Sequence, residues 1–114
     1  MIEKIVLDYL KDKLNMSEIY LETPKTLPSE YILFTVVDRD RANLIDAVTI
    51  EFYSYSTSKL NACLLDELVR KAMYDITDLA NVSASRLGGG NDTFDTTLKK
   101  YRYRCYFNII YTED

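Results

Sequence analysis

Two segments repeat apolar residues at intervals of three and four along the chain, which is the spacing of one face of an α-helix. Residues 2–14 form the first segment, in which charged residues fill the opposite face. The second covers residues 59–75 and follows three hydroxyl residues, 56–58, that can cap a helix. Because this second helix is the more apolar, we expect it to lie centrally across a sheet. Its predicted buried stripe comprises Leu60, Leu64, Leu68, Ala72 and Ile76, widened by Cys63, Leu65, Val69 and Met73.

The remaining apolar runs are β-branched or aromatic, or alternate with polar residues, and both patterns indicate strands. Pro24 and Pro28 place a turn after the first, short run. The next two strands are expected to form a hairpin with a long polar loop, residues 38–46. Three glycines at 88–90 end a weak strand, and residues 88–98 are predicted to be mobile. The predicted strands are residues 19–21, 30–37, 47–55, 79–87 and about 100–111.

The resulting order is one helix, three strands, a second helix and two strands. Strands joined by hairpins, with two helices free to pack on one side, predict an α+β fold in which two helices cover a mainly antiparallel sheet of four to five strands. At 114 residues, the chain has the common size of one domain. We therefore expect residues 1–114 to form a single α+β domain.

The chain is acidic, with a formal net charge of −4 and an isoelectric point near 4.8. Such a protein repels nucleic acid and anionic lipid unless its basic residues cluster, so general DNA binding is not expected. No segment approaches the roughly 20 apolar residues of a membrane span, and charges interrupt the N-terminal segment, so no signal peptide is expected. Cys63 and Cys105 form no CxxC pattern, and we expect both to be small buried hydrophobes in a protein made in a reducing cytoplasm.

The sequence offers little that performs chemistry. Histidine is absent, which removes the commonest general base and catalytic metal ligand. LGGGND, residues 87–92, lacks the lysine and hydroxyl of a P-loop, and DRDRA, residues 38–42, lacks the glycine of a calcium loop. We therefore expect no catalytic, cofactor-binding or metal site, and a function that is not enzymatic.

The last strand region, KKYRYRCYFNIIY at residues 99–111, mixes cations with aromatic rings. In a strand, alternate residues from Tyr101 to Tyr111 share a core-like face, and Arg102, Arg104 and Tyr106 share the other. No glycine separates the rings, as one does in RNA-recognition strands. Three interpretations stay open for the outward face, in decreasing order of fit: a protein–protein surface, a solvated sheet face, and a surface that stacks nucleic-acid bases.

Several of these segments together resemble one family, over nearly the whole chain. They are the short amphipathic N-terminal helix, TPKTLPSEYILF before the first long strand, the turn into the LLDELVRKAM helix, and the closing TFDTTLKKYRYRCYFNIIY. The chain in these features resembles the small tail-terminator or tail-completion proteins of long-tailed (siphovirus-type) bacteriophages and prophages, particularly those of Gram-positive bacteria. The closing Thr-rich loop and its Lys-Tyr-Arg-Tyr-Arg strand are the most specific part.

The resemblance implies a virion structural protein, made in the host cytoplasm, that forms a ring at the head-proximal end of the tail. The ring, expected to be a hexamer, would end tail polymerisation and enable head–tail joining. The implied partners are other copies of the chain, the major tail tube protein and head–tail connector proteins. No membrane and no sequence-specific nucleic acid are expected as partners, although DNA would pass through the ring. Candidate interface residues are Arg39, Arg41, Leu44, Arg86, Arg102, Arg104 and Tyr106.

A tail terminator of this kind would have to remain unassembled until a tail tube is present. Ordering of residues 88–98 on a tube template would delay ring assembly until a tube is present. Two alternatives remain: another connector or stopper ring at the head–tail junction, or a small α+β adaptor that binds its ligand through the sheet.

Overall fold

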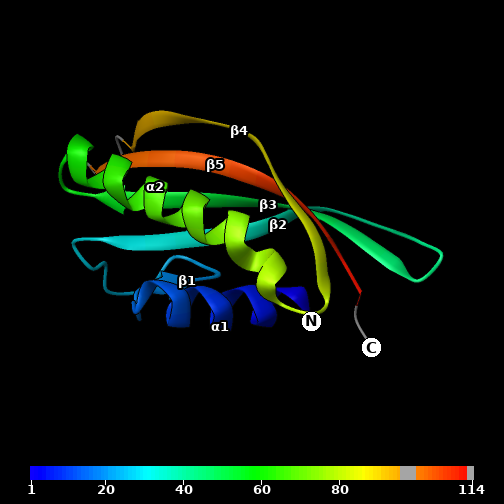
Figure 1. Cartoon of the computed structure of the whole chain (residues 1–114). Coiled ribbons are helices and arrows are strands. Elements are labelled where there is room, and N and C mark those ends of the chain that lie inside the picture. Colours follow the sequence, from blue (N-terminus) through cyan, green and yellow to red (C-terminus); the bar gives the residue numbers. More distant parts are fainter. Residues whose placement is uncertain (96–99, 113–114) are drawn as a thin grey trace.

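The computed structural model describes residues 1–95 and 100–112, which form two helices and a five-stranded sheet (Figure 1). The expected α+β fold and its order of elements are confirmed. The helices are α1 (Ile2–Leu14) and α2 (Lys59–Tyr74), and a short 3-10 helix, η1 (Asp75–Asp78), follows α2. The strands are β1 (Ile19–Tyr20), β2 (Tyr31–Ala42), β3 (Ile45–Ser56), β4 (Val82–Asp95) and β5 (Lys100–Tyr111).

The strands lie in the order β1-β2-β3-β5-β4. The two-residue β1 pairs with β2 in parallel, and the other three pairings are antiparallel. Both helices lie on the same side of the sheet (Figure 1). The sheet therefore has one face covered by helices and one face that no helix covers.

The core fills the space between the helices and the covered face. Phe34, Phe52 and Phe107 come from three adjacent strands, β2, β3 and β5, and are fully buried. The ring centroids of Phe34 and Phe52 lie 5.6 Å apart, and those of Phe52 and Phe107 lie 6.2 Å apart. The period-2 alternation of these strands places the rings on one face, which the sequence predicted for Phe52 and Phe107. The helices contribute Ile2, Val6 and Leu10 from α1, and Leu65, Val69, Ala72 and Met73 from α2.

The predicted stripe of α2 is partly wrong. The helix begins as expected, because the Ser58 hydroxyl accepts a hydrogen bond from the Asn61 backbone N–H at 3.1 Å. However, Leu60, Leu64 and Leu68 are 68%, 49% and 51% exposed. The helix has two adjacent apolar rows, and the sheet can cover only one of them. The covered row is the one that continues into η1, and its buried members are Ala62, Leu65, Val69, Ala72, Met73 and Ile76.

The predicted hairpin is confirmed, but most of the segment expected to be its long loop, residues 38–46, is strand. β2 continues to Ala42, and β3 begins at Ile45. Two residues, Asn43 and Leu44, make the turn, with φ of 53° and 68°, which is the left-handed geometry of tight hairpin turns. The polar sequence pairs across the strands because its charges alternate, with Arg41 lying 3.9 Å from Asp46. The hairpin projects beyond the rest of the molecule (Figure 1), whose extents are 44 × 24 × 24 Å.

The glycines do not end a strand, which corrects a second prediction. β4 starts at Val82 and runs through Gly88, Gly89 and Gly90 to Asp95, paired with β5. Pairing with β5 satisfies the backbone groups of this segment, and this outweighs the weak strand preference of glycine. Residues 88–95 therefore belong to the sheet, whereas residues 96–98 of the segment predicted to be mobile lie outside the described residues.

The two cysteines differ in burial. Cys105 is fully buried, as predicted, and Cys63 is partly exposed. Both thiols are free.

Candidate functional site

The uncovered face of the sheet carries most of the polar and aromatic side chains that the sequence marked out. Outward positions of β3 stand directly opposite outward positions of β5, so their side chains lie in rows across the sheet. Tyr55 pairs with Arg102, Tyr53 with Arg104, and Glu51 with Tyr106. We call these six residues the Tyr/Arg face.

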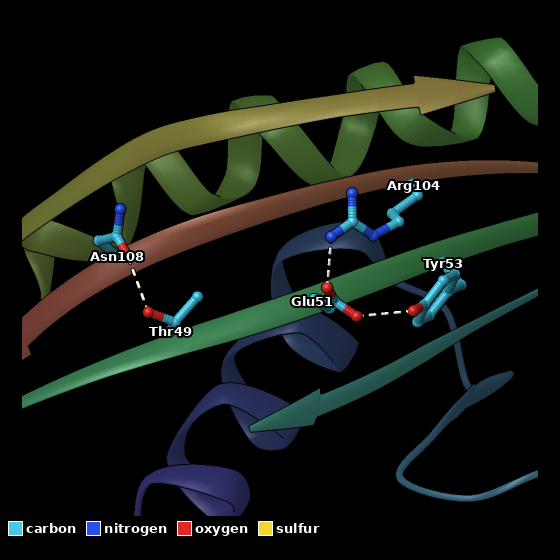
Figure 2. A network of polar contacts seen from close by, with 5 residues as sticks. All are labelled: Thr49, Glu51, Tyr53, Arg104 and Asn108. Atoms are coloured by element: carbon cyan, nitrogen blue, oxygen red, sulfur yellow. Dashed lines mark hydrogen bonds and ion pairs between the residues drawn. The ribbon is translucent and has the colours of Figure 1, made fainter. Parts of the chain in front are cut away.

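An ion pair lies at the centre of the Tyr/Arg face (Figure 2). One carboxylate oxygen of Glu51 accepts a hydrogen bond from the Arg104 guanidinium, and the other accepts from the Tyr53 hydroxyl at 2.6 Å. The Glu51 and Arg104 side chains are 18% and 31% exposed. Solvent therefore reaches the pair only in part, and each group holds the other in a fixed position.

The protonation states of the trio follow from this geometry. Partial burial alone would raise the pKa of Glu51, but the hydrogen bonds from Arg104 and Tyr53 outweigh it and lower the pKa. Burial and the hydrogen bond to Glu51 raise the pKa of Tyr53. The hydrogen bond to Glu51 also raises the pKa of Arg104. At neutral pH the trio is thus an anion, a cation and a neutral phenol, which is a stable arrangement rather than an acid–base couple.

The arginines also stack on aromatic rings. The Arg102 guanidinium lies 5.2 Å from the centre of the Tyr53 ring and 5.9 Å from that of Tyr55, and Arg104 lies 5.3 Å from that of Tyr106. These distances are within the range of cation–π attraction. The side chains of the face are therefore held in place before any partner arrives, which lowers the entropy that binding would lose.

Glycines of β4 make room for one of these rings. A Cβ atom at Gly88 would overlap the ring of Tyr106, and Gly89 also lies beneath that ring. The Tyr106 ring therefore covers bare backbone at the neighbouring strand. Gly88 and Gly89 therefore allow Tyr106 to pack on the strand, which differs from the flexibility that the sequence suggested.

A second, smaller polar contact lies further along the same face. The Thr49 hydroxyl donates a hydrogen bond to the Asn108 side-chain oxygen at 2.8 Å (Figure 2). Arg86 of β4 is paired with Asn108 in the sheet register and is exposed. Of the seven candidate residues, Arg86, Arg102, Arg104 and Tyr106 thus lie on one face of the sheet.

The other three candidates lie in the projecting hairpin. Arg39 forms an ion pair with Glu3 of α1, and Arg41 lies near Asp46, so both arginines turn toward the side of the sheet that carries the helices. Leu44 is at the tip and is 75% exposed. The structure does not bring these residues together with the Tyr/Arg face, so the seven candidates divide into two separate surfaces.

Sequence reasoning missed three members of the Tyr/Arg face, namely Glu51, Tyr53 and Tyr55. The signal was present, because they occupy alternate positions in AVTIEFYSY whose intervening residues are core. What the sequence did not contain was the register that places β3 beside β5. The exposed leucines of α2 were missed for the different reason given above.

A buried polar cluster lies on the covered side, between α2 and the sheet. Asp66 is 3% exposed and accepts a hydrogen bond from Arg70 at 2.7 Å. Burial raises the pKa of Asp66 although Arg70 opposes the shift, and burial followed by the nearby Asp66 carboxylate raises the pKa of Cys105 to about 12. The Cys105 thiol is therefore protonated and unreactive at neutral pH. The cluster is consistent with a structural role.

Within residues 1–95 and 100–112, no group of three or more acidic or cysteine side chains is arranged to hold a metal ion. Neither helix in this described part has the length and apolar character needed to cross a membrane.

Comparison with known proteins identifies the fold. No protein-family model and no curated protein matches the sequence. Among solved structures, the fold is similar to that of a chain in the virion of the native gene transfer agent (GTA) particle, with a TM-score of 0.64. The match covers 91% of this chain and 84% of that chain, at 11% sequence identity. This chain thus shares the fold of a virion component.

Proposed function

We propose that this chain is a structural protein of a phage-like virion and that it caps the head-proximal end of the tail tube as a ring. The observation that carries the proposal most is the fold likeness to a chain of the gene transfer agent virion over 91% of this chain. The sequence resemblance to tail-terminator proteins points to the same kind of particle.

The surfaces of the protein support an assembly role. The Tyr/Arg face is rich in the two residue types that dominate the energetics of protein–protein contacts. Its side chains are fixed by the Glu51–Arg104 ion pair and by cation–π stacking. A preordered surface of this composition suits a contact with a neighbouring protein.

A ring explains how such a protein acts without chemistry. Each copy would use one surface against a different surface of its neighbour, and closure of that heterologous contact would set the number of copies. Once the ring sits on the last layer of the tube, no further tube subunit can add there. Residues 88–95 are already strand, so their ordering on a tube cannot delay assembly of the ring.

A second candidate function is another ring component of the head–tail junction, such as a connector or stopper. The fold similarity to a virion chain supports this candidate equally, because the matched structure is described only as a virion and the place of that chain within it is not stated. The two candidates differ in what they bind, since a terminator recognises the end of the tube.

The test is to polymerise the tail-tube protein encoded in the same genome with and without this chain. A terminator should shorten the distribution of tube lengths in electron micrographs and leave a ring at one end. Arg104→Gln should weaken this effect, whereas Lys11→Gln, which removes a charge from the exposed side of α1, should not. A connector would leave tube lengths unchanged but join finished tails to heads. Monomers that ignore tubes, tails and heads at every concentration would overturn both readings.

A further inference from the structure

The hairpin tip exposes apolar side chains that the fold does not use. Leu44 and Ile45 are 75% and 48% exposed at the end of a hairpin that projects from the body (Figure 1). Leu44 also has a φ of 68°, a conformation that is unfavourable for a residue with a branched apolar side chain. The two-residue turn requires this conformation, but it does not require an exposed leucine at the position. Residues held in unfavourable conformations cluster at functional contacts.

The outward side of α2 offers a surface on which an apolar tip would fit. Leu60, Leu64 and Leu68 form one exposed row at intervals of four residues. The row spans about 12 Å, because a helix rises about 1.5 Å per residue. The strands of a two-stranded ribbon lie about 5 Å apart, so the width of the ribbon with its side chains is close to the length of this row.

One end of the leucine row opens into a hollow of about 180 Å³ between α2 and the end of α1. Its apolar walls are Leu14, Leu68 and Ala72, and two cations, Lys13 and Lys71, border it. Lys13 lies 3.8 Å from Asp75. Lys71 has no carboxylate partner in the described part of the chain.

The charges of the hairpin complement those of the hollow. After the bulge at Val37, Asp38 and Asp40 share the face of the hairpin opposite to the one that bears Arg39 and Arg41. Both arginines have acidic partners, whereas among the described residues Asp38 and Asp40 have no cation partner. The hairpin therefore combines an apolar tip with carboxylates that have no cation partner among the described residues, although Asp40 accepts a hydrogen bond from the Arg41 backbone N–H. The hollow combines apolar walls with the Lys71 ammonium group.

We propose that the β2–β3 hairpin tip of one copy of this chain docks on α2 of a second copy. Leu44 enters the hollow beside Leu68, Ile45 lies along the leucine row, and Asp40 faces Lys71. The two surfaces are different parts of the same chain, so the contact is heterologous and can repeat from copy to copy until a ring closes. This inference rests on the proposed ring function and names the contact that would build the ring.

A mixing experiment tests the contact. Leu44→Asp damages the tip but leaves α2 intact, and Leu68→Asp does the reverse. Each variant alone should remain monomeric in sedimentation velocity over the concentrations at which the wild type associates. An equimolar mixture should form one-to-one pairs that do not grow, because only one intact tip and one intact α2 surface can meet. Leu21→Asp, at another exposed leucine, is the matched control and should associate like the wild type.

Charge reversal gives a second measurement. Asp40→Lys and Lys71→Asp should each weaken association by about tenfold, since each places like charges together. The double variant should recover association to within about threefold of the wild type, because the pair is restored with its signs exchanged. Circular dichroism checks that every variant is folded.

The outcomes separate the inference from the function on which it rests. The same variants are also tested for binding to tail-tube ends, in case the wild type assembles only there. If the wild type assembles in either assay while Leu44→Asp and Leu68→Asp assemble equally well, the hairpin–α2 contact is wrong and the ring remains. If neither single variant associates and the mixture also forms no one-to-one pairs, the contact is not heterologous, and the inference is also overturned. A wild type that neither self-associates nor binds tube ends removes the proposed function and this inference together.

Discussion

Phe52 and Tyr53 are neighbours in β3, yet they stand in opposite environments. Phe52 is fully buried against Phe34 and Phe107, beneath the helices. Tyr53 lies on the uncovered face, where it donates a hydrogen bond to Glu51 and stacks with Arg102. One residue is held by exclusion of water, and the next is held by paired polar groups in partial contact with water.

This difference separates, within one sheet, the face that stabilises the fold from the face that we propose for recognition. Apolar burial contributes about 25 cal/mol per Å², and it is concentrated on the covered face. The Tyr/Arg face contributes less to folding because its charges are partly solvated. A face that is ordered but contributes little to stability can be changed by selection for a partner without unfolding the protein.

The largest predicted effect removes a ring from the covered face. Phe52→Ala leaves a cavity among three aromatic rings, and we expect it to lower the free energy of unfolding by about 3–5 kcal/mol. The adjacent Tyr53→Ala loses one hydrogen bond and one cation–π contact, and we expect a loss of about 1–2 kcal/mol. Urea unfolding of both variants measures the difference. Equal losses at the two positions would contradict the distinction between the faces.

The second prediction compares two glycines of β4 that face opposite sides. A Cβ atom at Gly90 would clash with the Arg104 backbone carbonyl and the Arg70 guanidinium, which itself pairs with buried Asp66. We expect Gly90→Ala to lower the free energy of unfolding by about 1–3 kcal/mol, as overpacking does.

Gly88→Ala is the matched control for this position. Its Cβ atom would overlap the Tyr106 ring, but a partly exposed side chain can swing aside more easily than a backbone carbonyl. Gly88→Ala should therefore cost less than Gly90→Ala in the same thermal or urea denaturation. The reverse order would show that the Tyr106 ring is as fixed as the backbone on the covered side.

The covered face was also the more predictable one from sequence. Alternation in AVTIEFYSY placed Phe52 in the core, because burial of one sheet face imposes a period of two. EYILFTVV predicts a strand from its β-branched and aromatic residues alone, which do not say that Phe34 faces the core. Alternation in the last strand placed Arg102, Arg104 and Tyr106 outward for the same reason. The partners of these outward residues were not predictable, because they depend on the register between strands far apart in the chain.

Two other errors have different physical causes. The polar residues of segment 38–46 predict a long loop in the hairpin, but ion pairs within the hairpin and to Glu3 support strand there. The helix α2 has two apolar rows side by side, and local periodicity cannot say which of them the sheet will cover. In both cases the deciding contacts are tertiary.

The third prediction concerns the pH dependence of the Tyr/Arg face. The pKa of Glu51 is lower in the folded protein than its ordinary value of 4.5, because the hydrogen bonds from Arg104 and Tyr53 outweigh the effect of burial. A carboxylate with a lowered folded pKa stabilises the fold above its unfolded pKa, and this contribution is lost as the pH falls through the folded pKa. The relevant window therefore lies below about pH 4.5.

Glu51→Gln removes this titration. At pH 7 we expect the variant to lose about 1 kcal/mol, because a charge-assisted hydrogen bond becomes a neutral one in a partly solvated site. The difference from the wild type should shrink as the pH is lowered below 4.5. Urea unfolding at pH 7 and at about pH 3 measures it, and a constant difference at both values would show that the ion pair does not carry the pH dependence.

The smallest effect on stability is predicted at the outward row of α2. Leu64 is 49% exposed and its neighbour Leu65 is 3% exposed. Leu64→Ala should change the free energy of unfolding by no more than about 0.5 kcal/mol, because a surface position loses little contact and alanine favours the helix. Leu65→Ala, which makes the same chemical change one residue along, should cost about 2–5 kcal/mol.

The order of the two effects should reverse when self-association is measured instead of stability. Leu64 lies in the row on which we place the hairpin tip of a second copy, so Leu64→Ala should weaken self-association by several fold while the monomer stays folded. Leu65 does not reach that surface, so Leu65→Ala should associate normally whenever enough of it is folded. If Leu64→Ala neither destabilises the monomer nor weakens association, the exposed row is an ordinary helix surface. If it destabilises as much as Leu65→Ala, the row is part of the core, as the sequence periodicity first suggested.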